Sequence, residues 1–105
     1  MVDIRSDAPV IVIGLGRFGA STAGQLDRQD REVLVVDTDM QLVQKWADRV
    51  THAVQADARS MEALRQIGAE QFQIAVVATG ASIEASVLIA ANLVDLGIPQ
   101  IWAKA

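Results

Sequence analysis

The sequence VIVIGLGRFG, at residues 10–19, decides the fold of this chain. Its first four residues are apolar without interruption, which is typical of a strand buried on both faces of a parallel sheet. The glycines that follow, Gly14, Gly16 and Gly19, have the G-x-G-x-x-G spacing of a loop that leads from a strand into a helix. We therefore expect a strand at 10–13, a glycine loop and a helix from Arg17.

The same alternation continues outward from this stretch to the end of the chain. Further apolar runs predict strands at 33–36 and 74–78, and the rhythm of the pattern places weaker strands at 51–55 and 100–103. Helical periodicity predicts helices at 17–28, 40–50, 60–67 and 82–96. Alternating strands and helices indicate an α/β fold, a Rossmann-like doubly wound parallel sheet of five strands in the order 3-2-1-4-5.

Composition narrows the class of protein. A chain of 105 residues is long enough for one domain, so we expect residues 1–105 to form a single domain. The net charge of −4 and the absence of a basic run weigh against a nucleic-acid partner. The chain has no cysteine, and its start has acids and a proline where a signal peptide has an apolar run. We expect a cytoplasmic location.

The glycine loop and an acid after the second strand predict a nucleotide site. Gly14 permits a tight turn, Gly16 lets the backbone approach a diphosphate, and Gly19 lets the helix pack on the strand. Asp37 ends the second strand eighteen residues after Gly19, where a carboxylate accepts hydrogen bonds from ribose hydroxyls and repels a 2′-phosphate. The blander alternative is that the glycines serve turn geometry only and that Asp37 caps a helix.

Other polar residues at strand ends have open alternatives. Asp57 lies where the adenine end of a nucleotide is expected, but it could equally cap the helix at Ser60. Arg17 either binds a phosphate or is simply solvated. Thr79 and Gly80 follow the fourth strand beside the crevice where the strand order reverses. The sequence has no Ser–His–Asp set, close acid pair or metal-ligand spacing, so we expect no enzymatic activity and no metal.

The last predicted helix is apolar around most of its girth. We expect one of its two apolar stripes to face the sheet, made of Ile83, Val87, Ala90, Ala91 and Val94. The second stripe, Ile89, Leu93 and Leu96 with Ala85, would then be exposed and would mediate self-association.

These residues give the chain a resemblance to a known family. From Val10 to its end, it resembles the N-terminal nucleotide-binding half of the RCK/KTN family, cytosolic regulators of potassium channels and of Ktr/Trk potassium uptake systems. The matching motifs are GLGRFG at 14–19, THAVQADA at 51–58, ATGASIEASVL at 78–88 and LGIPQIWAKA at 96–105. Arg59 departs from the family pattern, which often has threonine there. Family members continue into a C-terminal lobe, which we expect to be absent from this chain.

The resemblance implies a set of nucleotide-binding residues. The phosphates would lie on the glycine loop, the ribose against the acid after the second strand, and the adenine against the next loop, with the loop after the fourth strand closing the other side. The set is Gly14, Leu15, Gly16, Arg17, Phe18, Gly19, Asp37, Thr38, Asp57, Ala58, Thr79, Gly80 and Lys104, and among these Arg17 and Lys104 would reach the terminal phosphates.

The resemblance also implies a function. The bound effector would be ATP/ADP or NAD(H), and the domain would form homo-oligomers, dimers and then octameric rings in full-length form. It would lie at the inner face of the plasma membrane beneath a potassium transporter or channel subunit, which it would gate. The alternative is the NAD-binding domain of an oxidoreductase that lacks its substrate domain. The residues do not distinguish ATP/ADP from NAD(H), because the glycine loop and the ribose acid serve both.

Overall fold

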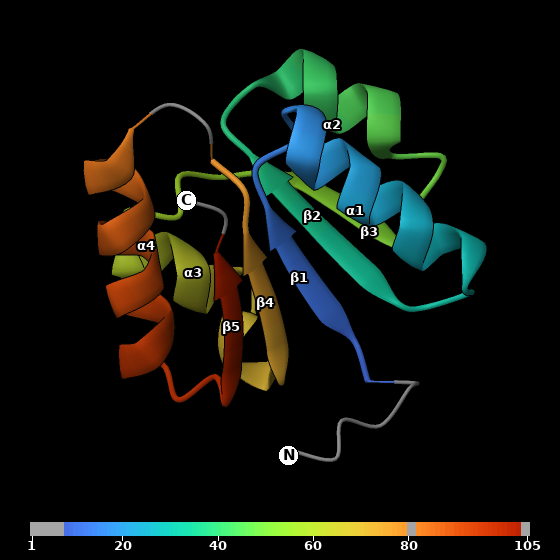
Figure 1. The fold of residues 1–105 in the computed structure, drawn as a ribbon. Helices are drawn as coiled ribbons and strands as arrows, with labels where there is room; N and C mark the ends of the chain where they lie inside the picture. Colours follow the sequence, from blue (N-terminus) through green and yellow to red (C-terminus); the bar gives the residue numbers. More distant parts are fainter. Residues whose placement is uncertain (1–7, 80–81, 104–105) are drawn as a thin grey trace.

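The computed structural model describes residues 8–79 and 82–103, and these form one twisted parallel sheet with helices on both faces (Figure 1). The strands are β1 (Val10–Ile13), β2 (Val33–Asp37), β3 (His52–Gln55), β4 (Ile74–Val77) and β5 (Gln100–Ala103). The helices are α1 (Arg17–Arg28), α2 (Met40–Trp46), α3 (Met61–Gln66), α4 (Ile83–Asp95) and a short 3₁₀ helix, η1 (Ala69–Gln71). The predicted order is confirmed, because the sheet runs β3-β2-β1-β4-β5 with every pair parallel.

Alternate residues of the central strands enter two separate cores. Val10 and Val12 of β1 belong to the core under α1 and α2, whereas Ile11 and Ile13 belong to the core under α3 and α4. Figure 1 shows these helix pairs on opposite sides of the sheet. Burial on both faces explains why these strands read as uninterrupted apolar runs.

The helix predicted at 40–50 is shorter in the structure. α2 ends at Trp46, and a turn follows in which the Val50 N–H donates to the Trp46 carbonyl. The turn returns Val50 to the core, and Ala47 is exposed. The predicted length was wrong because the apolar spacing up to Val50 is satisfied by a shorter helix followed by a turn.

The orientation of α4 is the opposite of the one expected. Ile89 and Leu93 are buried at 3% and 0% exposure, whereas Ile83 and Val87 are exposed at 81% and 63%. Both stripes are apolar, so hydropathy alone did not separate them. The larger side chains of one stripe fill the core, and Ser86 and Asn92 find hydrogen-bond partners on the inner side. The exposed stripe is thus made of Ile83, Val87, Ala91 and Val94 with the half-buried Ala90.

Candidate functional site

The loops that follow β1, β2, β3 and β4 meet at the carboxyl edge of the sheet. The sheet register places Ile13 beside Val36 and Val77, so these three strands end level with one another. A cavity of about 230 Å³ lies between the loops. Its lining includes six residues of the predicted site, Gly14, Asp37, Thr38, Asp57, Ala58 and Thr79, from four different loops.

Two glycines are required by the close packing of this loop. Gly14 has a φ of +100°, and a Cβ there would lie 2.7 Å from the Ala78 carbonyl oxygen. A Cβ on Gly19 would lie 1.8 Å from the Gly14 carbonyl oxygen. The predicted conformational roles are confirmed: Gly14 makes the turn beside β4, and Gly19 lets α1 approach the strand.

The N-terminus of α1 has no side-chain cap. Its N-cap is Gly16, which has no side chain, and its first turn has no acid. The other α-helices are capped by the side chains of Asp39, Ser60 and Ser82. A Cβ at Gly16 would meet no atom of residues 8–79 and 82–103 within 4 Å. A helix N-terminus without a side-chain cap or an acid suits an anion.

The Asp37 carboxylate joins the glycine loop to the start of α2. One oxygen accepts the Leu15 N–H at 2.7 Å and the other accepts the Asp39 N–H at 2.8 Å. Asp39, not Asp37, caps α2, because its side chain accepts the Gln41 N–H. Each carboxylate oxygen can accept more than one hydrogen bond, so Asp37 is held in place and can still receive ribose hydroxyls.

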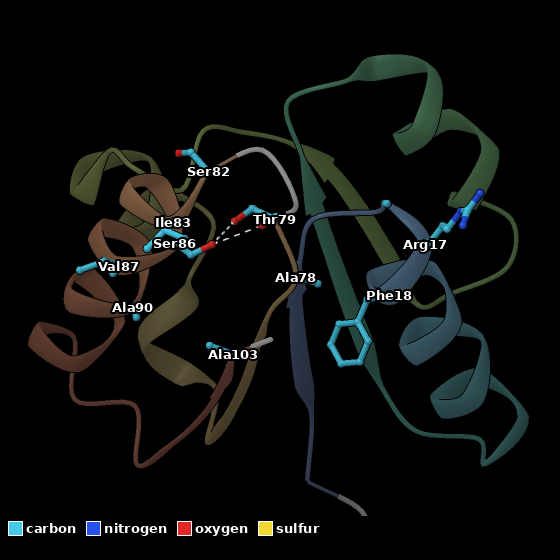
Figure 2. A pocket seen from close by; sticks show the side chains of 11 residues that line it. Arg17, Phe18, Ala78, Thr79, Ser82, Ile83, Ser86, Val87, Ala90 and Ala103 are labelled. Carbon is cyan, nitrogen blue, oxygen red and sulfur yellow. Dashed lines mark hydrogen bonds between the residues drawn. The ribbon is translucent and has the colours of Figure 1, made fainter. Parts of the chain in front are cut away.

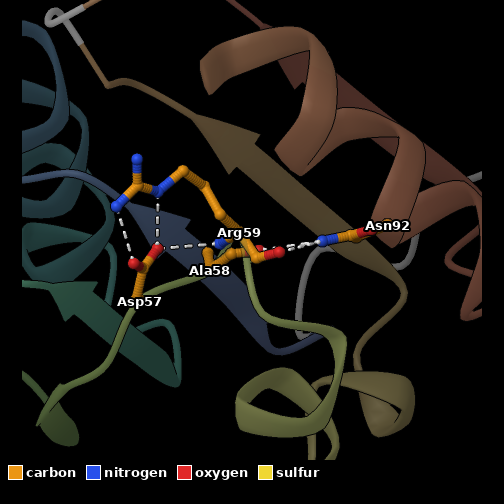
Figure 3. Close-up of polar contacts among 4 residues, drawn as sticks. All are labelled: Asp57, Ala58, Arg59 and Asn92. Carbon is orange, nitrogen blue, oxygen red and sulfur yellow. Dashed lines mark hydrogen bonds and ion pairs between the residues drawn. The ribbon is translucent and has the colours of Figure 1, made fainter. Parts of the chain in front are cut away.

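Asp57 pairs with Arg59 at the edge of the same cavity (Figure 3). The guanidinium donates from Nε and Nη2 to the two carboxylate oxygens at 3.0 and 2.8 Å. This pairing lowers the pKa of Asp57 below its usual value. Asp57 does not cap α3, since Ser60 does so by accepting the Ala63 N–H. Of the two alternatives for Asp57, the structure therefore contradicts the cap.

The loop that holds this pair is fastened to α4. The side-chain amide of Asn92 donates to the carbonyls of Ala58 and Arg59 at 3.2 and 3.0 Å (Figure 3). A second link joins α4 to the loop after β4, where the hydroxyls of Ser86 and Thr79 are 2.9 Å apart. The inner face of α4 thus bonds to two of the loops that line the cavity.

A second and larger cavity, of about 660 Å³, lies between the start of α1 and α4 (Figure 2). One side is lined by Gly16 and by Arg17 and Phe18 of α1, and Thr79, from the loop after β4, lies across from them beside Ser86. Its other lining residues are mainly apolar and come from α4 and β5, including Ile83, Val87, Ala90 and Ala103. The Arg17 guanidinium points away from Thr79 and α4 in Figure 2. Thr79 belongs to both cavities, so the two adjoin.

Most of the predicted site residues are brought together, with two kinds of exception. The side chain of Leu15 is 3% exposed and lies in the core, so this residue offers only its backbone to the site. The predictions for Gly80 and Lys104 lie outside the described residues. Three residues at the site, Arg59, Asn92 and Ser86, were not among those predicted. The only signal for Arg59 was its departure from the family pattern, and Asn92 and Ser86 had none.

Two other properties of the described part of the chain bear on the site. Within residues 8–79 and 82–103, no three His, Cys, Asp or Glu side chains gather as metal ligands would. None of the helices in that part is long and apolar enough to span a bilayer.

Comparison with known proteins identifies the family. Ktr system potassium uptake protein A of Bacillus subtilis (strain 168) is 46% identical over 94 residues, which are 90% of this chain and 42% of that protein. The chain therefore spans less than half the length of this relative.

Solved structures share the fold. The TrkA-N domain of the Escherichia coli inner membrane protein ybaL has a TM-score of 0.68 at 18% identity, over 97% of this chain and 90% of that one. The GsuK RCK domain has a TM-score of 0.69 at 20% identity, over 97% of this chain and 26% of that one. A putative short chain dehydrogenase/reductase of Aeromonas hydrophila also matches, with a TM-score of 0.66 at 17% identity over 87% and 52%.

The fold alone does not separate regulators from dehydrogenases, since both kinds of protein share it. The family is shown by sequence instead, because residues 10–105 match the model of the TrkA-N domain. This match confirms the resemblance drawn from the motifs. The chain belongs to the TrkA-N domain family.

Proposed function

We propose that this chain is a nucleotide-sensing regulatory domain of a potassium uptake system. The observation that carries the proposal is the position of the α1 N-terminus and of Asp37 beside two adjoining cavities. There a helix end without a side-chain cap lies beside a carboxylate, Asp37, whose position is fixed by two backbone N–H groups. Helix ends of this kind bind phosphates and carboxylates in this position bind ribose hydroxyls.

The two cavities suit the two parts of the ligand. The smaller cavity, with Asp37, Thr38, Asp57 and Ala58, takes the adenosine. The phosphates lie at Gly16, which lines the larger cavity, and that cavity also takes what extends beyond them. That extension is the terminal phosphate of ATP or the nicotinamide half of NAD(H). The proposed effector is therefore ATP/ADP or NAD(H), bound reversibly and not consumed.

The family and its potassium-uptake relative support the regulatory role. We propose that the domain acts from the cytoplasmic face of the membrane on a potassium transporter or channel subunit, without enzymatic activity. The full-length protein would form dimers and octameric rings. Gating then requires that two states of the assembly bind the effector with different affinities.

The exposed stripe of α4 supports self-association. Ile83, Val87 and Val94 are 81%, 63% and 63% exposed, and they follow one another along a single helix face. Monomeric proteins rarely expose contiguous apolar surface of this kind. We propose this stripe, in place of the buried one first expected, as a contact between copies of the chain.

The NAD-binding domain of an oxidoreductase remains the second candidate. The larger cavity favours it, because about 660 Å³ beside the phosphate loop can admit the nicotinamide half of a dinucleotide. Turnover of NADH with a substrate by the full-length protein would move the assignment to this candidate.

Calorimetric titration of the purified chain with ATP, ADP, NAD and NADH tests the proposal. We expect saturable binding of at least one of these nucleotides with one site per chain. Mass spectrometry of ligand carried through purification identifies the physiological effector. If none of the four nucleotides binds and none is carried through, the nucleotide-sensing function is wrong.

A further inference from the structure

The Arg59 side chain lines the smaller cavity, of about 230 Å³, at a position where the family pattern often has threonine. Among the described residues lining this cavity, Arg59 has the positive charge, and Asp37 and Asp57 have the negative ones. Its guanidinium is bound by a two-point fork to the Asp57 carboxylate, at 3.0 and 2.8 Å. Figure 3 shows the side chain turned back from its own backbone to reach Asp57.

This ion pair is better suited to positioning than to stability. The Arg59 and Asp57 side chains are 57% and 43% exposed, and ion pairs with such exposure add little to the free energy of unfolding. The fork, however, fixes the plane of the guanidinium. The same carboxylate also accepts the Arg59 N–H at 3.0 Å, and Asn92 anchors the Ala58 and Arg59 carbonyls. Backbone and side chain of this loop are therefore both held.

A guanidinium bound edge-on to a carboxylate keeps its flat faces free. Those faces stack on aromatic rings, a property that lysine lacks. The phosphates of a nucleotide are expected at Gly16, which lines the other cavity and not this one. The two carboxylates that line this cavity with Arg59, those of Asp37 and Asp57, also make it unfavourable for a phosphate. The neutral base is the part of the ligand that fits there.

Building on the proposed nucleotide-binding function, we propose that Arg59 stacks on the purine base of the bound nucleotide and that Asp57 holds its guanidinium in the stacking plane. Arg59 is then a specificity-determining residue for ligands that have an aromatic base. Its contribution does not depend on the number of phosphates.

Calorimetry with AMP, ADP and ATP at fixed salt tests this assignment, using Arg59→Ala, Arg59→Lys and the control Arg65→Ala. Arg65 lies in the last turn of α3, is exposed and does not line the cavity. We expect Arg59→Ala to weaken all three nucleotides by a similar factor of about three- to tenfold. Arg59→Lys should lose nearly as much nucleotide affinity, because lysine keeps the positive charge but has no planar guanidinium. Arg65→Ala should bind as the original chain does.

A second measurement reports stacking directly. In NMR spectra of the original chain, the Nε–H resonance of Arg59 should move upfield when AMP is added, because the base ring lies over the guanidinium. Ribose 5-phosphate, which has no base, should not move it.

The outcomes separate this inference from the proposed function. If the original chain binds none of the three nucleotides and neither NAD nor NADH, both are wrong. If it binds them and Arg59→Ala changes nothing, only the role of Arg59 is wrong. A loss that grows from AMP to ATP would likewise overturn stacking, since it would indicate contact with phosphates.

Discussion

Among the single residues of the candidate site, two carboxylates accept hydrogen bonds that hold the loops around the cavity. Asp37 accepts the N–H groups of Leu15 and Asp39, and Asp57 binds the side chain and the N–H of Arg59. These local bonds fix the geometry into which a nucleotide would fit. Three predictions concern single residues.

Replacing Asp37 with alanine should weaken adenine-nucleotide binding by about 1.5–3 kcal/mol, the range for hydrogen bonds to a charged group. The variant also loses the two N–H contacts, so its fold is checked by circular dichroism. Asp39→Ala is the matched control: it removes the α2 cap, costs about 1 kcal/mol of stability, and should leave affinity unchanged. Equal affinities of Asp37→Ala and the original chain for ATP and NADH would contradict the ribose role.

Replacing Arg17 with alanine should weaken the binding of ATP more than that of ADP or NADH. The extra loss of binding free energy for ATP should be about 1 kcal/mol. The side chain is exposed and starts from the N-terminal end of α1, so it can turn toward a terminal phosphate. Titrations of the three ligands are compared at one salt concentration, because salt screens these contacts. Arg28→Ala, at the far end of the same helix, is the control. An equal loss for ATP and ADP would rule out the terminal-phosphate role, and a selective loss for NADH would favour the oxidoreductase.

The titration of Asp57 should depend on Arg59. Pairing lowers the pKa of Asp57, so the stabilisation from this pair is fully present above the ordinary aspartate pKa of about 3.9. It is lost as the pH falls through the lower pKa of the folded state. NMR titration of the Asp57 carboxyl carbon should show this depressed pKa, and Arg59→Ala should return it toward the ordinary value. No change between the two chains would mean that the pair does not persist in solution.

At the scale of elements, α4 connects the candidate site to the exposed stripe. Ser86 and Asn92 on its inner side bond to loops that line the cavities, and Val87 on its outer side is exposed. A movement of either loop would therefore act on α4, the helix that carries the surface proposed for self-association.

The orientation of α4 predicts opposite effects for two substitutions on it. Val87→Glu should retain the fold and shift the chain to a smaller species in light scattering, with Met40→Glu, an exposed apolar position on α2, as its control. Leu93→Ala should lower the free energy of unfolding by about 2–5 kcal/mol in denaturant titration, because Leu93 is fully buried. If Leu93→Ala dissociates the assembly and Val87→Glu unfolds the chain, the orientation described for α4 is wrong.

In the molecule as a whole, the order of the strands was predictable from the sequence, since right-handed crossovers between alternating strands and helices leave few arrangements. The need for glycine at positions 14 and 19 was predictable as well, because both belong to a short loop motif. The structure adds the contacts: a Cβ on Gly19 would meet the Gly14 carbonyl, and one on Gly14 would meet the Ala78 carbonyl of the neighbouring strand end. The nucleotide site that the same motif places at this edge of the sheet stays a prediction.

The tertiary structure alone decided which face of α4 is buried and which loops it holds. Periodicity finds two apolar stripes on a helix, but only contacts with distant segments select between them. Asn92 bonds to Ala58 and Arg59, which precede it by 34 and 33 positions in the sequence. The contact between Ser86 and Thr79 depends on how α4 packs. Residues of this kind have no signal in the sequence, because their partners are brought near only when the chain folds.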